Sequence, residues 1–352
     1  MNAARNIDFL IVGQGLAGSA LAMKCCERRY KILVFDDPSQ NHSSRVAAGL
    51  FNPVTGKYMT KTWLADLIFP TLFEYYTAVE GLTRRRFFNP IPIYRPFAGI
   101  EEQNEWMGRS AAASYDAFVS NISQAPAFKG KINEPFGGVT LKQSGYLDTR
   151  AYLEAVRTYL EDRGAYRAQK FDGEKLEVRD DWVQYGDISA KKIIFCQGVQ
   201  NATNRWFNTC PVEPLKGEMI QVQCALPMDV IFNRGVFMVP GPNSSDWRVG
   251  ATYNREDHEP QVTASARDEL TRKLDDLVRV PFSVTGQYWG VRPTTPDRRP
   301  VIGSHPNLRS MVIFNGLGTK GVSLAPYFSE ILIRWLEGRG TIGKEADISR
   351  FN

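Results

Sequence analysis

The chain has few of the residues that build metal sites and disulfide frameworks. It contains 5 cysteines and 3 histidines among 352 residues. The cysteines are odd in number and include no CxxC pair, so neither a disulfide framework nor a zinc site is expected. The histidines, His42, His258 and His305, lie far apart in the sequence and show no ligand spacing. We therefore expect no metal and a reducing, cytoplasmic compartment.

The chain also lacks a strong charge imbalance and a long apolar run. Lys and Arg number 43 against 38 Asp and Glu, and the resulting net charge of +5 is too small to indicate a nucleic-acid-binding protein. The densest basic run, Arg84-Arg85-Arg86, is typical of a solvated turn. No stretch approaches the roughly 18 consecutive apolar residues of a membrane span. With 43% hydrophobic residues, the chain can bury a large core and is expected to form two lobes.

The N-terminal stretch "IDFLIVGQGLAGSALAMKCCERRYKILVFDD" predicts a buried strand, a tight turn, a helix and a second strand. Its apolar run is typical of a parallel strand that is covered on both faces. Gly13, Gly15 and Gly18 form a GxGxxG pattern. The first glycine permits the turn, the second lets a pyrophosphate approach the backbone, and the third lets helix and strand pack closely. The pattern predicts a dinucleotide site.

Acidic residues end the second strand of this unit. Asp36 lies 18 residues after Gly18, where a carboxylate can accept hydrogen bonds from the ribose hydroxyls of an adenosine. Asp37, and Leu16 and Ala17 at the start of the helix, belong to the same predicted site. The free N–H groups at the helix N-terminus favour phosphate binding. These residues alone do not distinguish FAD from NAD.

The remaining chain alternates between two kinds of segment. "AYLEAVRTYLEDRGA" predicts an amphipathic helix, "KKIIFCQG" and "MVIFNG" predict buried strands that join the first sheet, and the last helix carries an apolar face from Leu324 to Trp335. Residues 86–145 and 216–287 have a different character, aromatic and proline-rich or alternating in the β manner. We expect these two segments to form one inserted substrate domain. Residues 1–85, 146–215 and 288–352 would then form the nucleotide-binding domain.

Four segments in order resemble the D-amino-acid oxidase and glycine oxidase superfamily of FAD-dependent amine oxidoreductases, the DAO family. They are "VGQGLAGSALA", "SSRVAAGLFNP", "IIFCQG", and the pair "GVRPTTPDRRPVIG" with "NGLGTKGVSLAP". The resemblance implies an α/β fold: a Rossmann-like FAD-binding domain of the glutathione-reductase type, with an inserted mixed α+β substrate domain built on an antiparallel sheet. It also implies FAD as the cofactor. Non-covalent binding is expected, because no cysteine follows the Arg292 motif.

The resemblance assigns further residues to the cofactor. They are Ser44, Arg45, Ala48 and Gly49 beside the flavin, Phe171 at the adenine, Gly198 after the buried strand, and the loop Gly316, Leu317, Gly318, Thr319, Lys320 and Gly321. Backbone N–H groups of this loop, at a helix N-terminus, are suited to stabilising negative charge on a reduced flavin, and Lys320 would add a full positive charge. A common family form has His where Leu317 stands, so the chain departs from glycine oxidase there.

The predicted substrate site centres on Arg292. Its planar guanidinium can hold a carboxylate in bidentate fashion. If "QYWGVRP" is a strand, Tyr288, Gly290 and Arg292 share one face, and Gly290 would leave room for the isoalloxazine ring. Tyr253 and Tyr94 are candidates to close the pocket. The alternative is that Arg292 or Arg298 merely braces the turn by pairing with Asp297.

The main functional hypothesis is an FAD-dependent enzyme that oxidises the C–N bond of a small amino acid or secondary amine bearing a carboxylate, by hydride transfer to flavin N5. Oxygen or an electron carrier would reoxidise the flavin. A second hypothesis is a tRNA-modifying flavoprotein that removes a carboxymethyl group from a wobble uridine, since "GLGTKGVSLAP" also resembles the terminal loop of such an oxidase. A non-catalytic flavin-binding protein is a third. An NAD dehydrogenase would leave the C-terminal motifs unexplained.

Overall fold

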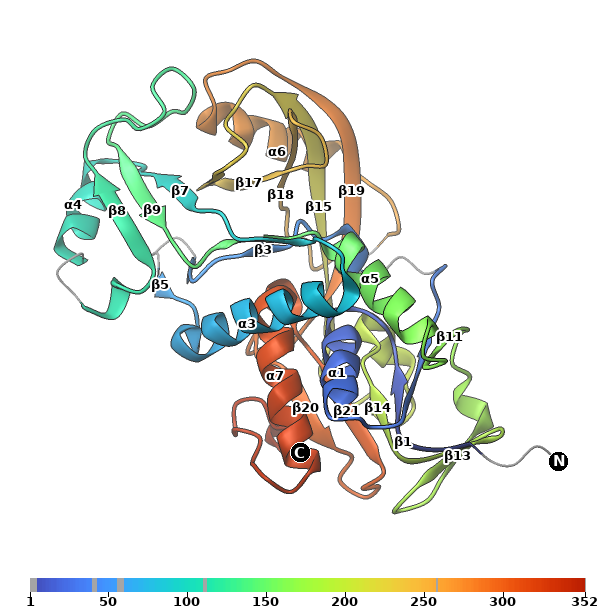
Figure 1. Ribbon diagram of the computed structural model, residues 1–352. Helices are drawn as coiled ribbons and strands as arrows, with labels where there is room; N and C mark the ends of the chain where they lie inside the picture. The colour runs from blue at the N-terminus through green and yellow to red at the C-terminus, as the bar shows by residue number, and fades with distance from the viewer. Residues whose placement is uncertain (1–4, 40–42, 56–59, 110–112, 258, 352) are drawn as a thin grey trace.

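The computed structural model describes residues 5–39, 43–55, 60–109, 113–257 and 259–351, which form two eight-stranded sheets and two small ones, with helices around them (Figure 1). His42 and His258 lie outside the described residues. None of the described helices is both long enough and apolar enough to cross a bilayer.

The first sheet is the predicted nucleotide-binding sheet. Its parallel strands follow the order β11-β2-β1-β14-β21, with an antiparallel hairpin of β12 and β13 beside β14 and with β20 antiparallel to β21. The bounds are β1 (Arg5–Val12), β2 (Ile32–Asp36), β11 (Tyr166–Ala168), β12 (Leu176–Val178), β13 (Val183–Tyr185), β14 (Ile188–Phe195), β20 (Val301–Ser304) and β21 (Met311–Asn315). The run "IIF" pairs with both β1 and β21 and is fully buried, as its lack of polar residues predicts.

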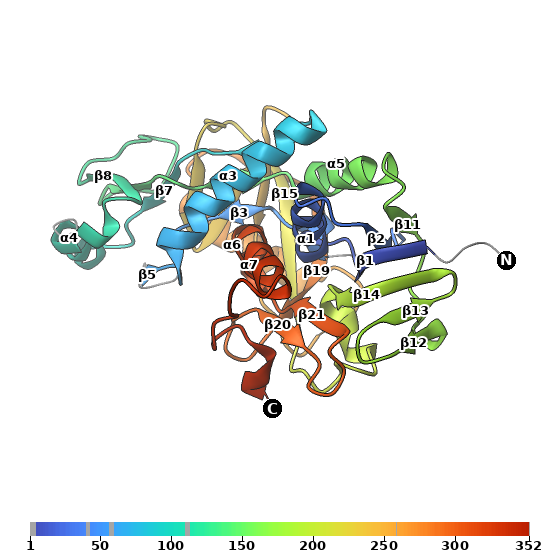
Figure 2. The same ribbon diagram turned by 60° about the horizontal axis from the view of Figure 1, so that its bottom comes forward.

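Helices cover one face of this sheet and form the larger core. α1 (Leu16–Glu27) contacts α7 (Gly321–Leu336), which in turn contacts α3 (Ala65–Thr83), while α5 (Thr149–Glu161) lies beside α1. Figure 2 shows α1 and α7 side by side above the strands. Leu324, Phe328 and Leu332 of α7 are buried, which confirms the apolar face predicted for the last helix.

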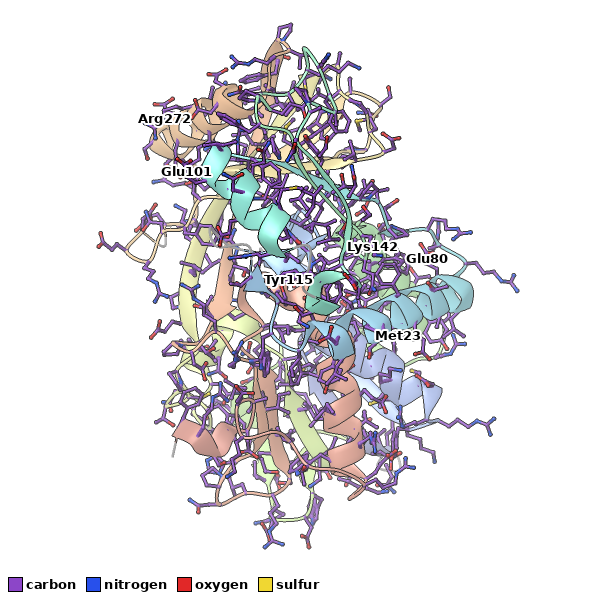
Figure 3. The ribbon with its side chains drawn as sticks, turned by 90° about the vertical axis from the view of Figure 1, so that its left-hand side faces the viewer. Met23, Glu80, Glu101, Tyr115, Lys142 and Arg272 are labelled. Atoms are coloured by element: carbon purple, nitrogen blue, oxygen red, sulfur yellow. The ribbon has the colours of Figure 1, made fainter. Side chains whose placement is uncertain are left out.

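The second sheet is mostly antiparallel and has the order β19-β15-β18-β17-β16-β7-β9-β8, with one parallel pair between β16 and β7. The bounds are β7 (Ile93–Pro96), β8 (Val119–Ser123), β9 (Gly138–Leu141), β15 (Glu213–Cys224), β16 (Ile231–Arg234), β17 (Val236–Pro240), β18 (Asp246–Gly250) and β19 (Phe282–Thr294). Helix α6 (Ala264–Leu277) packs on it through Leu270, Leu274 and Leu277, and α4 (Ile100–Arg109) follows β7. In Figure 3 this lobe carries Glu101 and Arg272, whereas Met23 of α1 lies in the other lobe.

Short elements complete the chain between and beside the two sheets. They are α2 (Ser43–Val46), β3 (Leu50–Phe51), β4 (Val54–Thr55), β5 (Thr60–Lys61), β6 (Phe88–Asn89), β10 (Gly145–Leu147) and the 3₁₀ turns η1 (Ala113–Tyr115), η2 (Gly173–Lys175), η3 (Gly198–Thr203), η4 (Gly318–Lys320) and η5 (Ile348–Phe351). Strands β15 and β19 run continuously through the boundaries expected near residues 215 and 287. These two long strands therefore carry side chains from the second sheet toward the first.

Candidate active site

A cavity of about 2120 Å³ is lined by residues of both sheets. Its wall includes the loop between β1 and α1, the ends of β2 and β14, the loop before α7, and the long strands β15 and β19. Ordinary ligand pockets occupy roughly 300–1,000 Å³, so this cavity has room for a dinucleotide together with a second ligand.

The cavity brings together nearly all of the residues that the sequence assigned to a cofactor. Those that line it are Gly13, Gly15, Leu16, Ala17, Asp36, Asp37, Ser44, Ala48, Gly49, Phe171, Gly198, Gly290 and every residue from Gly316 to Gly321. Gly18 and Arg45 do not line it. Gly18 instead lies under the helix, where an added Cβ would come within 1.9 Å of the Gly13 carbonyl oxygen, which fits its predicted packing role.

The start of α1 fits the phosphates of a dinucleotide. Gly13 has a φ of +100°, and a Cβ there would lie 2.5 Å from the backbone oxygen of Cys196. Gly15 is the N-cap, and no side chain caps the helix through it. The Leu16 N–H donates to the Ser44 hydroxyl at 3.2 Å. The turn still presents a glycine backbone and a helix N-terminus to the cavity, which is the arrangement that binds pyrophosphate.

We expect Gly13→Ala to lower FAD affinity about tenfold or more, because both the positive φ and the contact with Cys196 must be relieved by moving the turn. Gly186→Ala is the matched control, since Gly186 also has a positive φ, of +58°, but a Cβ there would meet nothing within 4 Å. Flavin fluorescence during dialysis would measure FAD retention. Equal retention by the two variants would contradict the assignment of this turn.

Asp36 is buried, and its carboxylate already accepts hydrogen bonds from other residues of the protein. One carboxylate oxygen accepts a hydrogen bond from the Gln14 N–H at 2.9 Å, and the other pairs with Arg45 at 3.2 Å. Arg45 does not line the cavity, and its guanidinium donates to Asp36 and to the carbonyl of Pro38. Its place beside a flavin stays a prediction. The Tyr166 hydroxyl donates to the same oxygen as Arg45, at 3.5 Å, and Asp36 lines the cavity where the ribose of a dinucleotide is expected.

The glycine-rich loop forms the η4 turn and leads into α7, whose N-cap is Lys320 without a capping side chain. Two of its N–H groups are engaged within the protein: Gly316 donates to Asn315 Oδ1 and Lys320 donates to the Leu317 carbonyl. The set of N–H groups that can face a bound flavin is thus smaller than the sequence implied. The Lys320 ammonium contacts the hydroxyls of Thr62 and Thr55 at 3.2 and 3.4 Å. Burial, and then the positive charges of Arg299 and Arg298, lower the pKa of Lys320 to about 8.

Arg292 lines the cavity from β19 without a carboxylate partner among the described residues. Its Nη1 donates to the Thr252 carbonyl at 3.3 Å, and its guanidinium lies 5.0 Å from the centre of the Tyr253 ring. Burial lowers the pKa of Arg292 from its usual value. The guanidinium lies directly over Gly217 of β15, where a Cβ would be 2.1 Å from Nη1. The site thus holds an incompletely satisfied cation, which is costly unless an anion binds.

The tyrosines predicted for the substrate site divide into one that lines the cavity and two that do not. Tyr253 lines it and is 66% exposed. Tyr94 is 1% exposed, donates to Glu134 and packs in the core of the second sheet, so its expected role in closing the pocket is corrected. Tyr288 is also outside the cavity wall: it is 44% exposed and donates to Gln221 at 2.9 Å.

Tyr288, Gly290 and Arg292 lie at alternate positions of strand β19, as the sequence predicted. The small size of Gly290, however, is explained by a contact within the protein rather than by room for a flavin ring. Tyr288, Gly290 and Arg292 pair with Met219, Gly217 and Leu215 of β15. A Cβ on Gly290 would lie 2.6 Å from a methyl of Val46 in α2, so this glycine admits that short helix. The alternative in which Arg292 or Arg298 pairs with Asp297 is also corrected, because within the described residues the ion-pair partner of Asp297 is Arg350, at 2.8 Å.

A family model described as FAD dependent oxidoreductase (DAO) matches residues 8–335. The chain belongs to this family. It is 21% identical over 369 residues to a glycine oxidase of Geobacillus kaustophilus, covering 95% of this chain and 94% of the relative. It is 23% identical to the bifunctional protein ThiO/ThiG of Synechocystis, of which it spans about half the length (51%, with 92% of this chain covered). The bifunctional protein MnmC of Idiomarina loihiensis, named for tRNA 5-methylaminomethyl-2-thiouridine biosynthesis, is 24% identical, with 95% of this chain and 56% of that protein covered.

Solved structures show the same fold. A crystal structure of glycine oxidase from Geobacillus kaustophilus aligns with a TM-score of 0.77 at 19% identity, covering 99% of this chain and 98% of that one. L-proline dehydrogenase from P. horikoshii aligns with a TM-score of 0.78 at 14% identity, again covering 99% and 98%. These alignments show the α/β fold expected from the sequence, and the family match makes the chain a member of the FAD-dependent oxidoreductases.

Cysteine and metal chemistry find little support in the described part of the chain. No group of three or more His, Cys, Asp or Glu side chains there is arranged to hold a metal ion. The five cysteines are free thiols. Cys196 lines the cavity, but burial raises the pKa of its thiol well above the usual value, which makes it a poor nucleophile for attachment to a flavin.

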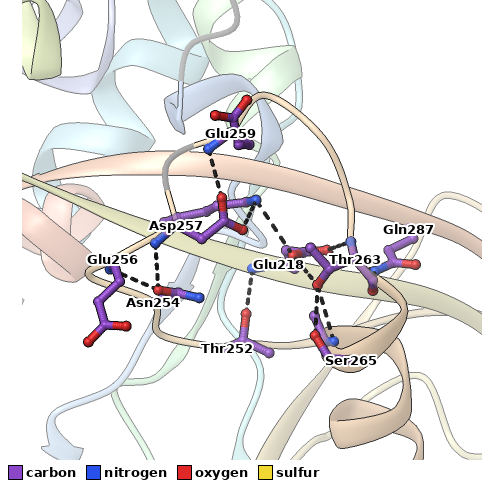
Figure 4. A network of polar contacts seen from close by, with 11 residues as sticks. Glu218, Thr252, Asn254, Glu256, Asp257, Glu259, Thr263, Ser265 and Gln287 are labelled. Atoms are coloured by element: carbon purple, nitrogen blue, oxygen red, sulfur yellow. Dashed lines mark hydrogen bonds and ion pairs between the residues drawn. The ribbon is translucent and has the colours of Figure 1, made fainter.

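The sequence did not reveal several residues that support the site. Gly217 under Arg292 is one, and Trp63 and Arg299 in the cavity wall are others. A network behind β15 is also new: Lys216 and Glu218 join the loop that follows β18 to the sheet (Figure 4). The repeated arginines of "DRRP" were the available sequence signal for Arg299, whereas Gly217 becomes recognisable only once β15 and β19 are paired.

Proposed function

We propose that the protein oxidises the C–N bond of a small amino acid or secondary amine that carries a carboxylate. The observation that carries this proposal is Arg292: a planar cation, withdrawn from water in a large cavity, with no carboxylate of its own among the described residues. A substrate carboxylate would supply the missing partner in a bidentate pair. The similarity to glycine oxidase gives the proposal further support.

Bound FAD would supply the hydride acceptor; the substrate would lose a hydride from the carbon beside the amine nitrogen, and water would hydrolyse the resulting imine. The protein's part is orientation. Arg292 would fix the carboxylate end of the substrate, and Tyr253 would cover the pair from the solvent side through its contact with the guanidinium. The turn at Gly13, with Asp36, would hold the adenosine diphosphate half of the cofactor, and the loop before α7 would lie at the flavin.

The direct test is the visible spectrum of the FAD-loaded protein under anaerobic conditions, titrated with glycine, sarcosine, D- and L-amino acids, and unmodified and modified tRNA. Bleaching by one carboxylate-bearing amine would support the proposal. Bleaching by modified tRNA alone would assign the protein to the tRNA-modifying alternative. A flavin that no compound reduces would favour a non-catalytic role.

Gly217→Ala provides a second test of the Arg292 site without removing the arginine. The added methyl would fall 2.1 Å from Nη1, and since the guanidinium is the mobile end of a long side chain, it should swing away from its position. We expect the affinity for methoxyacetate, an inert carboxylate, to fall about tenfold, because a charge-assisted pair is lost. FAD affinity should not change. Unchanged methoxyacetate binding, measured by the shift of the flavin band, would contradict the proposed position of the substrate carboxylate.

A further inference from the structure

A second group of cations lines the cavity, separate from Arg292. Arg299, in the turn after β19, stacks on Trp63 with its guanidinium 4.0 Å from the ring centre. Trp63 follows Thr62, whose hydroxyl contacts the Lys320 ammonium at 3.2 Å. Lys320, Arg299 and Trp63 therefore form one wall, which we call the Arg299 wall, and Arg298 lies beside it on the cavity surface.

The Arg299 wall is held rigidly. Trp63 is stacked on Phe328 of α7, with ring centres 5.6 Å apart, and its indole N–H donates to Glu345 at 3.2 Å. A planar guanidinium stacked on a fixed aromatic ring loses less freedom when it binds an anion. The wall thus presents its positive charge in a prepared position.

The positive charge of this wall is uncompensated within the described residues. Neither Arg299 nor Lys320 forms an ion pair there. Of the nearby acids, Asp297 pairs with Arg350, and Glu345 accepts from the neutral Trp63 indole without forming an ion pair with Arg299 or Lys320. The four acids that do line the cavity, Asp36, Asp37, Asp172 and Glu174, all lie with the adenosine-side residues of the wall.

Within the described residues the other cations of the same cavity are paired, apart from Arg298 and the exposed Lys170. Lys61 contacts Asp66 at 2.7 Å, Arg95 contacts Glu102 at 2.8 Å, and Arg205 and Arg255 contact Glu174 and Glu213, each at 3.1 Å. Like charges placed together without acids cost free energy: burial, and after it the positive charges of Arg299 and Arg298, lowers the pKa of Lys320. Such a cost is typical of a site that is completed by an anionic ligand.

The Arg299 wall and Arg292 are distinct positions. Arg292 rests on Gly217 and Tyr253 of the second lobe, whereas Arg299 rests on Trp63 at the start of α3. Arg299 and Arg298 act electrostatically on Lys320, whereas Arg292 is not among the groups that do so. One carboxylate therefore does not account for both positions.

We propose that the substrate carries two anionic groups, one bound by Arg292 and the other by Arg299 with Lys320. This inference rests on the proposed function and narrows it to amines with a second carboxylate or a phosphate. The second anionic group of the substrate raises its affinity for the protein, because it supplies the partner that the Arg299 wall lacks. A substrate with a single carboxylate would leave these cations unpaired.

Two ethers test the proposal on the FAD-loaded protein without any reaction. Methoxyacetate carries one carboxylate, and diglycolate carries two on the same ether skeleton. We expect diglycolate to bind about tenfold or more tightly than methoxyacetate, as one further charge-assisted pair predicts. Arg299→Gln should remove this difference while leaving methoxyacetate affinity unchanged. Arg205→Gln is the matched control, because Arg205 also stacks on a tryptophan in the cavity wall, 4.5 Å from the Trp206 ring centre, but is paired with Glu174.

The pH dependence gives a second readout. Diglycolate is doubly ionised throughout the range from pH 7 to 9.5. Its affinity should be greatest below the pKa of Lys320, about 8, and fall as the pH rises above it, because the ammonium loses its charge. Methoxyacetate should show no such fall, and Lys320→Met should abolish the fall for diglycolate. Phosphonomethoxyacetate in place of diglycolate would distinguish a phosphate-type group from a second carboxylate by its relative affinity.

The outcomes separate this inference from the proposed function. If methoxyacetate binds through Arg292 but diglycolate binds no better, the two-anion proposal is overturned and the proposed function stands. If neither ether binds, both fail. Loss of FAD from Arg299→Gln in step with diglycolate would assign the Arg299 wall to the cofactor instead. Arg299-dependent binding of unmodified tRNA, with equal affinity for the two ethers, would replace the small dianion by a nucleic-acid backbone.

Discussion

Replacing Arg292 by alanine is expected to lower kcat/KM for the carboxylate-bearing substrate by about a hundred- to a thousandfold, since truncating one partner of a buried charge pair costs roughly 2–5 kcal/mol. The decrease in kcat/KM should be much larger for substrates that carry a carboxylate than for amines without one. For example, the preference for sarcosine over dimethylamine in flavin reduction should largely disappear. Arg292→Lys should recover little of it, because an ammonium cannot reproduce the planar fork.

FAD retention separates loss of substrate binding from general damage to the site. Arg292 lies on the β19 side of the cavity, away from the Gly13 turn, so the flavin content of Arg292→Ala should match that of the unaltered protein. Arg255→Ala is the matched control: Arg255 also lines the cavity but is exposed and already paired with Glu213 at 3.1 Å. If both variants lose activity equally, or if Arg292→Ala keeps its preference for sarcosine, a carboxylate is not bound at Arg292.

The nucleotide-binding half of the fold could be predicted because its signals are local. The turn at Gly13 and Gly15, the apolar strand before it and the acid at Asp36 all lie within one βαβ unit, where spacing along the chain determines spacing in the fold. The final helix is similar, since its buried face follows from a period of 3.6 residues. These elements could be predicted without knowing any contact between residues far apart in the sequence.

The substrate side could be predicted only in part, because it depends on strand pairing. Tyr94 and Tyr253 are alike as aromatic residues near strands, yet the second sheet buries Tyr94 against Glu134 and leaves Tyr253 on a loop over Arg292. Tyr288 shares the face of Arg292 but lies farther along β19, near a register shift between Gln221 and Val222. Periodicity identifies the face, and only the sheet determines which residues of that face reach the cavity.

The loop that carries Tyr253 is fixed by contacts with β15, along the strand edge that does not pair with β19. Its backbone pairs with the strand: Asn254 and Lys216 exchange N–H···O bonds of 2.9 and 3.0 Å, and the Thr252 N–H donates to the Glu218 carbonyl at 3.1 Å. Asp257, farther along the loop, then returns to the strand, and its carboxylate lies 2.6 Å from the Lys216 ammonium (Figure 4). The Lys216 side chain is 1% exposed.

Glu218 completes this buried network. It lies 4.0 Å from Lys216 and accepts hydrogen bonds from the Thr263 N–H and hydroxyl at 2.9 and 2.8 Å and from Gln287 at 2.8 Å. These contacts join β15, β19 and the N-cap of α6, where the Thr263 hydroxyl accepts from the Ala266 N–H. Both ends of the Tyr253 loop are thus attached to one cluster of buried charges.

Lys216→Met is therefore expected to destabilise the protein by about 3–5 kcal/mol, because it leaves the buried Glu218 carboxylate without its cation. Asp257→Asn, which leaves Lys216 with Glu218, should cost less, and the double variant should be no worse than Lys216→Met, since the two positions share one interaction. Lys273→Met is the control: its 2.5 Å contact with Glu269 is on the surface of α6, and its loss should cost less than about 1 kcal/mol. Denaturant unfolding with saturating FAD would measure all four variants.

The same variants test whether this network positions the substrate site. Tyr253 covers Arg292 only while its loop stays on β15, so Asp257→Asn should weaken methoxyacetate binding even under conditions where the protein remains fully folded and keeps its FAD. Lys273→Met should leave that affinity unchanged. A loss of stability with unaltered methoxyacetate affinity would mean that the ion pair supports the fold of the second lobe but not the geometry at Arg292. A parallel loss of both would make Lys216 and Asp257 positioning residues for the cation that binds the substrate.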